Sequence, residues 1–414
     1  MLAIEGGTPV RTEPLPKRAL FGEAEKQAAV GLFDEAIESG GAIGYGGPEE
    51  AAYEAAFVDF HGGGFADLVN SGTSAVYAAL GGLELAPAGE VVVPPITDPG
   101  GVMPVALLNL IPVVADAMPG TFNAGAGQIE AVLTPHTRAI LVAHIAGEPA
   151  EMDPILDLAQ RRGLPVVEDC AQSHGARYQG RLVGTLGAVA AFSTMSGKHH
   201  ATGPQGGVVY STDEELGWRC KRFADRGKPL GLEGGTNTRA GLNLNGNDLA
   251  AAVGRVQLAR LPQIIAARRQ VAGAISAGLE GAAAVRLGRE LPDTEGVYWF
   301  LRIHVDTGKL TVDKDTFARA VAAEGIPTNP SYRHLPAEAD WFRRRRVFPP
   351  GDYPWGLPAY EGNREAVFPC PDAIEAVESH FLIHIHENFA DPDVADIVAA
   401  LRKVEEACLK GEGA

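Results

Sequence analysis

The sequence predicts an α/β protein with two parts. A large domain, residues 1–262, is expected to be built on a mostly parallel sheet flanked by helices, and residues 263–414 are expected to form a smaller C-terminal α+β domain. Short, wholly apolar runs alternate with helical segments through the first part, which is typical of a parallel sheet covered on both faces. From residue 280 onward the pattern changes to a partly alternating strand among helices. The length of 414 residues also suffices for two domains.

The chain is expected to begin with an extended arm over residues 1–20, which are rich in Pro, Gly and Arg. The segment 23–39 has helical spacing and places Val30, Phe33 and Ile37 on one face. A glycine-rich turn then leads into a second helix, in which four residues can face a core: Ala52, Ala55, Ala56 and Phe60.

The remaining elements follow from apolar periodicity and stop signals. Strands are expected at short apolar runs, namely 91–96, 105–114, 139–144, 165–167, 188–192 and 206–210. Helices are expected at 128–133, 153–162, 214–223 and 248–261, with a second helix from Pro262 to about Leu279. The small domain is expected to hold a strand at 297–305, a helix at 315–324, a strand at 381–386 and a last helix at 391–406.

The charge of the chain argues against two classes of partner. The formal net charge is -17 and the isoelectric point is about 5.1. Nucleic acids and anionic membranes attract basic surfaces, so neither is an expected partner. The one basic run, Arg343–Arg346, is interpreted as a solvated or salt-bridged surface rather than as a phosphate site. The start of the chain lacks a basic, apolar leader and no apolar run approaches a membrane span, so a cytoplasmic protein is expected.

Neither the cysteines nor the histidines predict a metal site. His384 and His386 fall on one face of an expected strand, but no third ligand stands at a recognisable spacing. The cysteines lie far apart and form no C-x-x-C pair, which argues against zinc and against a disulfide framework. We therefore expect free thiols at all four positions: Cys170, Cys220, Cys370 and Cys408.

A lysine and an acid follow the ends of two predicted strands. Asp169 comes just after the apolar run 165–167, and Lys198 lies in a polar loop after the run 188–192. A lone lysine in such a loop would be an ordinary surface residue. Because open α/β sheets bind their ligands at the carboxyl ends of the strands, we expect Lys198 and Asp169 to meet there.

A candidate phosphate-binding turn precedes another helix. Ser71, Gly72 and Thr73 stand between a short strand and a helix start, and both hydroxyl residues are good helix caps. The free backbone N–H groups of a helix N-terminus attract anions. Alone the turn indicates only a cap; together with Lys198 and Asp169 it favours phosphate binding.

This combination predicts pyridoxal phosphate as the cofactor. That cofactor requires a lysine for a Schiff base, an acid at its pyridinium nitrogen and anchors for its phosphate. Asp169 is the candidate acid, because a carboxylate keeps the ring nitrogen protonated. Lys198 is the candidate nucleophile, which must lose its proton to react.

The chain resembles the DegT-type sugar aminotransferase family, which has the aspartate-aminotransferase fold of pyridoxal-phosphate enzymes (fold type I). The resemblance covers nearly all of the chain and rests on motifs in the family's order. These are Ile4–Val10, Asn70–Thr73, Glu168–Gln172, the Lys198 loop and Gly241–Asn243. It implies that residues 1–262 form the cofactor-binding domain.

The resemblance also implies roles for matching residues. Lys198 would hold the cofactor as a Schiff base and later move the proton between substrate and cofactor carbons. Asp169 would pair with the pyridinium nitrogen, and Gln172 would contact the phenolic oxygen.

The phosphate would be held by Gly72, Thr73 and Ser193, and by Asn243 from a partner subunit, because the family's sites lie at a dimer interface. The glycine-rich segment 227–246 is long and poor in apolar residues, so ordering it without a partner would be costly. We therefore expect a homodimer with shared active sites.

Three positions depart from the family pattern. Asp98 stands where an aromatic residue usually covers the cofactor ring, so an acid there could instead contact the substrate. Gln205 replaces a common acid, and Asn245 replaces a common arginine two residues after Asn243. These departures leave the cofactor prediction intact but put the usual sugar-nucleotide substrate in question.

The leading hypothesis is an aminotransferase that passes an amino group from glutamate or glutamine to a keto sugar, sugar nucleotide or cyclitol. One alternative is a dehydratase or other eliminating enzyme on the same fold. In one dehydratase branch a histidine replaces the lysine, and here Lys198 is present with His199 beside it. The other alternative is a non-catalytic regulatory relative, against which the intact Lys198 and Asp169 argue.

Overall fold

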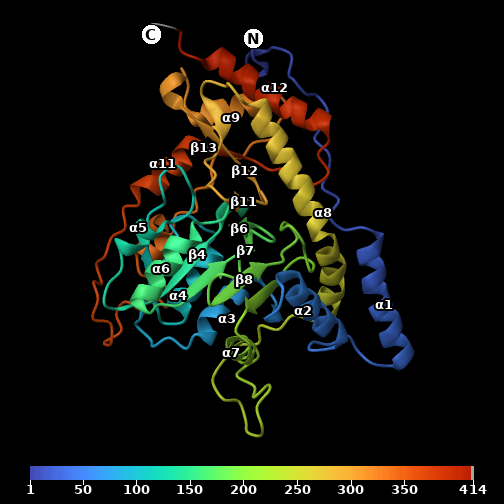
Figure 1. The fold of residues 1–414 in the computed structure, drawn as a ribbon, viewed down its shortest axis with the longest axis vertical. Helices are drawn as coiled ribbons and strands as arrows, with labels where there is room; N and C mark the ends of the chain where they lie inside the picture. The colour runs from blue at the N-terminus through green and yellow to red at the C-terminus, as the bar shows by residue number, and fades with distance from the viewer. Residues whose placement is uncertain (412–414) are drawn as a thin grey trace.

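A seven-stranded sheet forms the centre of the computed structural model, which describes residues 1–411 (Figure 1). In spatial order its strands are β1 (Phe65–Val69), β9 (Gly207–Ser211), β8 (Val189–Ser193), β5 (Val166–Asp169), β4 (Thr137–Ala143), β2 (Glu90–Val93) and β3 (Ile111–Val114). Only β9 is antiparallel to its neighbours, so six strands run in one direction. The predicted α/β fold with a mostly parallel sheet is confirmed.

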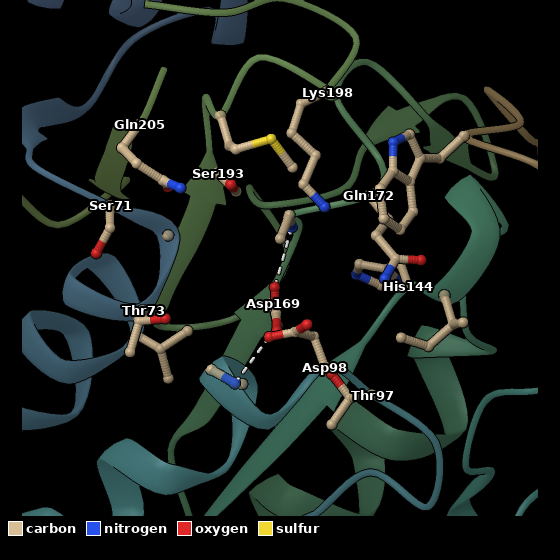
Figure 2. A pocket seen from close by; sticks show the side chains of 18 residues that line it. Ser71, Thr73, Thr97, Asp98, His144, Asp169, Gln172, Ser193, Lys198 and Gln205 are labelled. Atoms are coloured by element: carbon tan, nitrogen blue, oxygen red, sulfur yellow. Dashed lines mark hydrogen bonds between the residues drawn. The ribbon is translucent and has the colours of Figure 1, made fainter. Parts of the chain in front are cut away.

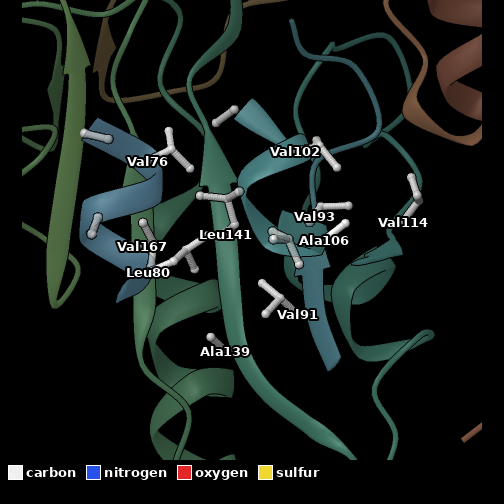
Figure 3. Packing of buried hydrophobic residues seen from close by; sticks show 14 of the residues in the cluster. Val76, Leu80, Val91, Val93, Val102, Ala106, Val114, Ala139, Leu141 and Val167 are labelled. Carbon is white, nitrogen blue, oxygen red and sulfur yellow. The ribbon is translucent and has the colours of Figure 1, made fainter. Parts of the chain in front are cut away.

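Both faces of this sheet are covered, because alternate residues of each strand enter different cores. Val91 and Val93 of β2 pack with helix α3 (Gly72–Gly82) on one face, as Figure 3 shows, whereas Val92 packs on the other. Helices α4 (Met103–Leu107) and α7 (Glu214–Ala224) also belong to the first face. The second face carries α2 (Pro48–His61), α6 (Met152–Arg162) and the start of α8.

Helix α8 (Asp248–Gly278) is continuous, which corrects the prediction of two helices separated at Pro262. Proline removes one helical N–H donor and usually ends or kinks a helix. Here Leu258, Leu261 and Ile265 around it are all buried, and their packing holds the helix together. The division at residue 262 therefore falls inside α8, and the domain boundary stays a prediction.

The C-terminal part surrounds a small antiparallel sheet of β10 (Val285–Leu287), β12 (Leu301–Val305) and β13 (His380–Ile383). Helices α9 (Lys314–Ala323), α11 (Pro371–Ser379) and α12 (Asp391–Cys408) flank it, and α10 (Asp340–Arg343) lies in the long connection. The expected strands at 297–305 and 381–386 are shorter than predicted. His384 and His386 follow β13 and share no strand face.

The N-terminal arm is bound to this C-terminal part. The buried Glu324 carboxylate accepts hydrogen bonds from the backbone N–H of Ala3 (2.8 Å) and of Val10 (3.0 Å). Arg18 then donates to the Glu387 carboxylate at 2.9 Å. These hydrogen bonds hold the N-terminal arm against the C-terminal part of the chain.

Other predictions of local structure need correction. The apolar run 105–114 divides into α4 and β3. In α2 the predicted Ala56 and Phe60 pack against the core while partly exposed, Ala55 is exposed, and the buried aromatic residues are Tyr53 and Phe57. The four cysteines are free and buried, as predicted. The remaining short elements are η1 (Ala3–Glu5), η2 (Pro99–Gly101), η3 (Ile145–Gly147), α5 (Ala126–Glu130), β6 (Arg177–Tyr178), β7 (Arg181–Leu182), β11 (Thr294–Glu295), η4 (Thr307–Lys309) and η5 (Pro336–Glu338).

Helix α1 (Glu23–Ser39) forms as predicted, but its apolar face is uncovered. Val30, Phe33 and Ile37 are 38%, 51% and 78% exposed. Figure 1 shows α1 at the side of the molecule beyond α8. Within the described chain, no core therefore covers the apolar side chains on this face of α1.

Candidate active site

A cavity of about 290 Å³ lies at the carboxyl ends of β2, β5 and β8 (Figure 2). Six of the seven predicted site residues line it: Gly72, Thr73, Asp169, Gln172, Ser193 and Lys198. Asn243 does not, and it is exposed elsewhere on the chain. The structure thus brings together the residues predicted from distant motifs, with Asn243 as the exception.

The N-terminus of α3 forms one side of the cavity. Ser71 caps the helix, because its hydroxyl accepts from the backbone N–H of Ser74 at 3.1 Å. Gly72 follows in close contact with Ser193, where an added Cβ would lie 2.6 Å from the Ser193 Cβ. Glycine therefore lets the helix end reach β8, and the first-turn N–H groups stand beside the Ser193 hydroxyl as an anion site.

Asp169 ends β5 inside the cavity and is buried. Burial raises the pKa of its carboxyl, while the hydrogen bond from the Ala171 N–H (3.0 Å) and the charge of Lys198 act in the opposite direction. A cationic ring nitrogen placed here would further stabilise the carboxylate, since an opposite charge favours its ionised form.

Lys198 lies in the loop after β8, and its side chain points toward the centre of the cavity (Figure 2). Burial lowers its pKa to about 8, against the opposing charges of Asp169 and Asp98. The amine nitrogen lies 3.5 Å from the centroid of the Trp299 ring. A lowered pKa leaves part of the amine unprotonated near neutral pH, which is the form that attacks carbonyl groups.

Groups from remote parts of the chain hold the lysine loop. Arg18 of the arm donates to the carbonyl oxygens of Lys198 (2.7 Å) and His199 (2.9 Å). The Trp299 indole N–H donates to the carbonyl of Gly197 at 2.8 Å. Neither Arg18 nor Trp299 was predicted from sequence motifs, because both are far from the lysine loop in the sequence.

Buried histidines form the wall behind the loop. His174 bonds the Ser193 carbonyl (2.8 Å), His199 bonds the Val297 carbonyl (2.9 Å) and His200 bonds the Tyr53 hydroxyl (2.8 Å). Burial lowers the pKa of His174 to about 3 and those of His199 and His200 well below the usual value. These rings are therefore neutral structural groups, and His199 does not enter the cavity.

Gln172 is fixed by two hydrogen bonds at the cavity edge. Its side-chain oxygen accepts from the Ala146 N–H, and its amide nitrogen donates to the Tyr332 hydroxyl, both at 2.8 Å. An amide nitrogen carries two hydrogens, so one remains for a ligand.

His144 also lines the cavity, and it pairs with Glu168 at 3.1 Å. His144, Glu168 and Cys170 lie within metal-binding distance of one another. The Glu168 oxygens, however, also accept from three backbone N–H groups, those of Gly184, Leu186 and Gly187. This carboxylate is already saturated, so the group is a structural hydrogen-bonded cluster.

Comparison with known proteins decides the family. The sequence profile of the DegT/DnrJ/EryC1/StrS aminotransferase family matches residues 23–402. The chain belongs to this family. It is therefore an aminotransferase, and the family uses pyridoxal phosphate.

Three relatives of this aminotransferase illustrate its range. It is 32% identical to a GDP-perosamine synthase of Caulobacter vibrioides over 68% of this chain and 76% of the relative. It is 31% identical to an L-glutamine:2-deoxy-scyllo-inosose aminotransferase of Micromonospora echinospora over 98% and 97%. The solved structure of DesV from S. venezuelae in complex with a ketimine intermediate has a TM-score of 0.81 and 28% identity, covering 95% of this chain and 99% of that one.

Within residues 1–411, no helix combines the length and the apolar character needed to cross a membrane.

Proposed function

We propose that this aminotransferase uses pyridoxal phosphate to move an amino group from glutamine or glutamate to a keto cyclitol or keto sugar. The observation that carries the proposal is the convergence of Lys198, Asp169 and the N-terminus of α3 in one cavity. The donor set fits this cofactor, since it offers one buried amine, one buried acid and one anion site.

Each residue has a role in this scheme. When bound, the cofactor supplies an electron-withdrawing ring that stabilises negative charge on the substrate carbon. The Lys198 amine would attach the cofactor and move the proton at the substrate carbon. Asp169 would keep the ring nitrogen protonated, and Gln172 would offer its remaining amide hydrogen to the phenolic oxygen. Gly72, Thr73 and Ser193 bind the phosphate.

Coverage of the relatives favours a cyclitol acceptor. The 2-deoxy-scyllo-inosose aminotransferases of Micromonospora echinospora, Streptomyces lividus and Streptomyces fradiae match 97–98% of this chain. The GDP-perosamine synthase matches only 68%. Similarity that extends through the C-terminal part includes the segment 331–335, where acceptor contacts are expected and where Tyr332 bonds Gln172 of the cavity.

The same proposal includes a homodimer. The apolar face of α1 is uncovered, and Leu232 and Leu242 of the glycine-rich segment are 49% and 57% exposed. Exposed apolar patches of this kind mark protein interfaces. A second copy of this chain would cover them and would bring Asn243 to the partner's phosphate, since Asn243 does not line the active-site cavity formed by residues 1–411 of its own chain.

The test is isotopic. The loaded enzyme is incubated with glutamine labelled with ¹⁵N at the α-amino group and with 2-deoxy-scyllo-inosose or a keto sugar, and the product is examined by mass spectrometry. We expect an amine that carries the label. Loss of water without amination, or an unlabelled product with every acceptor, would contradict the proposal.

A further inference from the structure

Asp98 lines the active-site cavity and is open to solvent there. It follows β2 and caps η2, with its Oδ1 accepting from the Gly100 N–H at 2.9 Å. The preceding Thr97 N–H donates to the His334 carbonyl at 2.9 Å, and Pro99 follows. Figure 2 shows the carboxyl group beside Asp169 on the cavity floor.

One oxygen of this carboxyl is free for a ligand. Within residues 1–411, Asp98 forms no ion pair, and its Oδ2 accepts no hydrogen bond. Figure 2 shows Asp98 on the same side of the cavity as Asp169, with the Lys198 side chain pointing toward both. The turn needs only Oδ1, so a structural role leaves half of the carboxylate unused.

The charges around the cavity limit what can bind beside Asp98. Among residues 1–411 of one chain, its lining includes two acids, Asp98 and Asp169, and one cation, Lys198, but no arginine. The anion site at α3 is assigned to the phosphate of the cofactor. A second phosphate near Asp98 would meet a carboxylate of like charge, whereas a hydroxyl group could donate to it.

We propose that Asp98 selects the amino acceptor by accepting a hydrogen bond from a hydroxyl group beside the ketone. It thereby favours uncharged polyhydroxylated cyclic ketones over acceptors with phosphate close to the ketone. This inference rests on the proposed function and assigns the acceptor specificity of that site to one residue.

The donor and acceptor half-reactions can be measured separately, and the proposed role of Asp98 affects mainly the acceptor half-reaction. Asp98→Asn keeps the cap oxygen but loses the charge. We expect kcat/KM for 2-deoxy-scyllo-inosose to fall about tenfold to a hundredfold, mainly through KM, as for a lost hydrogen bond to a charged group. The donor half-reaction with glutamine, followed by cofactor absorbance, should stay within about twofold or become faster, because the donor's carboxylate no longer meets Asp98. Asp157→Asn on the exposed side of α6 is the control for net charge and should change neither half.

A binding measurement tests the same contact without turnover. Titration of 2-deoxy-scyllo-inosose into the pyridoxal-phosphate form, which has no amino group to transfer to the ketone, should give a larger dissociation constant for Asp98→Asn than for the parent and for Asp157→Asn. Equal affinities, or equal losses in both half-reactions, would overturn the role of Asp98. A parent enzyme with an unreactive donor half-reaction would instead refute the proposed function, and the binding comparison would still decide the role of Asp98.

Discussion

Two regions of the molecule differ in how their side chains are held. The lysine wall, made of Asp169, Ser193 and the loop 193–202, is mostly buried and fixed by hydrogen bonds from three parts of the chain. The outer surface, made of α1 and the segment 227–246, exposes apolar side chains, and Figure 1 shows the segment extending away after α7. The contrast supports the proposed dimer, in which one chain would supply the reactive half of the site and a partner would supply the other half.

The largest expected effect is the removal of the lysine amine. Lys198→Ala should abolish transfer and the yellow absorbance of the bound cofactor, because no other lysine lines the cavity within the described residues. Spectra of the purified protein after borohydride reduction measure this directly. Lys17→Ala on the exposed arm is the matched control and should behave as the parent. A reducible Schiff base at another lysine would contradict the assignment.

The second prediction concerns the acid of the lysine wall. Asp169→Asn keeps the acceptor for the Ala171 N–H but cannot hold the pyridinium proton by charge, so the ring withdraws electrons poorly. We expect the fold and much cofactor binding to remain while the rate falls at least about a hundredfold, close to 3 kcal/mol in barrier. Single-turnover rates and near-ultraviolet dichroism separate the two effects. A rate within about fivefold of the parent would move this role to another residue.

The lysine wall was predictable in outline because its residues end apolar strands. Lys198, Asp169 and the Ser71–Thr73 turn each follow a recognisable run, and parallel strands place their carboxyl ends at one edge. Trp299 and Arg18 were not predictable, since they reach the loop from remote segments and belong to no motif. Dependence on remote packing also explains the wrong prediction of a break at Pro262. There the buried neighbours in α8 outweigh the usual tendency of proline to end a helix.

The outer surface was predictable only in part. Helical spacing located α1 and its apolar face, but spacing does not say which molecule covers that face. The sequence pattern predicted that Asn243 belongs to the phosphate site. In the structure Asn243 lies outside the active-site cavity of its own chain. Its role in the site therefore stays a prediction that depends on the dimer.

The third prediction tests that dependence. Phe33→Glu with Ile37→Glu places charges on the uncovered face of α1, so we expect monomers in sedimentation and at least about a tenfold loss of activity, since desolvating unpaired charges would oppose assembly. Gln27→Glu, an exposed position on the same helix, is the control for added charge.

Mixing provides a complementary measurement. Inactive Lys198→Ala chains refolded together with inactive Asn243→Ala chains should regain activity through hybrid dimers that hold one intact site. A fully active monomer, or no recovery on mixing, would refute the shared site.

The smallest expected effect concerns acid stability and is absent near neutral pH. His61 packs against Phe57, Phe192 and Tyr210 behind the lysine wall, and burial lowers its pKa to about 4. In the unfolded chain the ring titrates near its ordinary value, about 6.5. The stabilising contribution of the neutral ring is therefore complete above that pH and is lost as the pH falls toward 4.

His61→Phe keeps an aromatic ring in this cluster and removes the titration. The free energy of unfolding of the parent should fall more steeply than that of the variant between pH 6.5 and pH 4.5, by about 2 to 3 kcal/mol over the interval. Urea unfolding at several pH values measures the difference. Glu54, whose pKa burial raises to about 7, acts with the opposite sign in both proteins and cancels in the comparison. Parallel pH profiles would show that His61 has the same pKa in the folded and the unfolded chain, and the lysine wall would then not depend on a neutral histidine core.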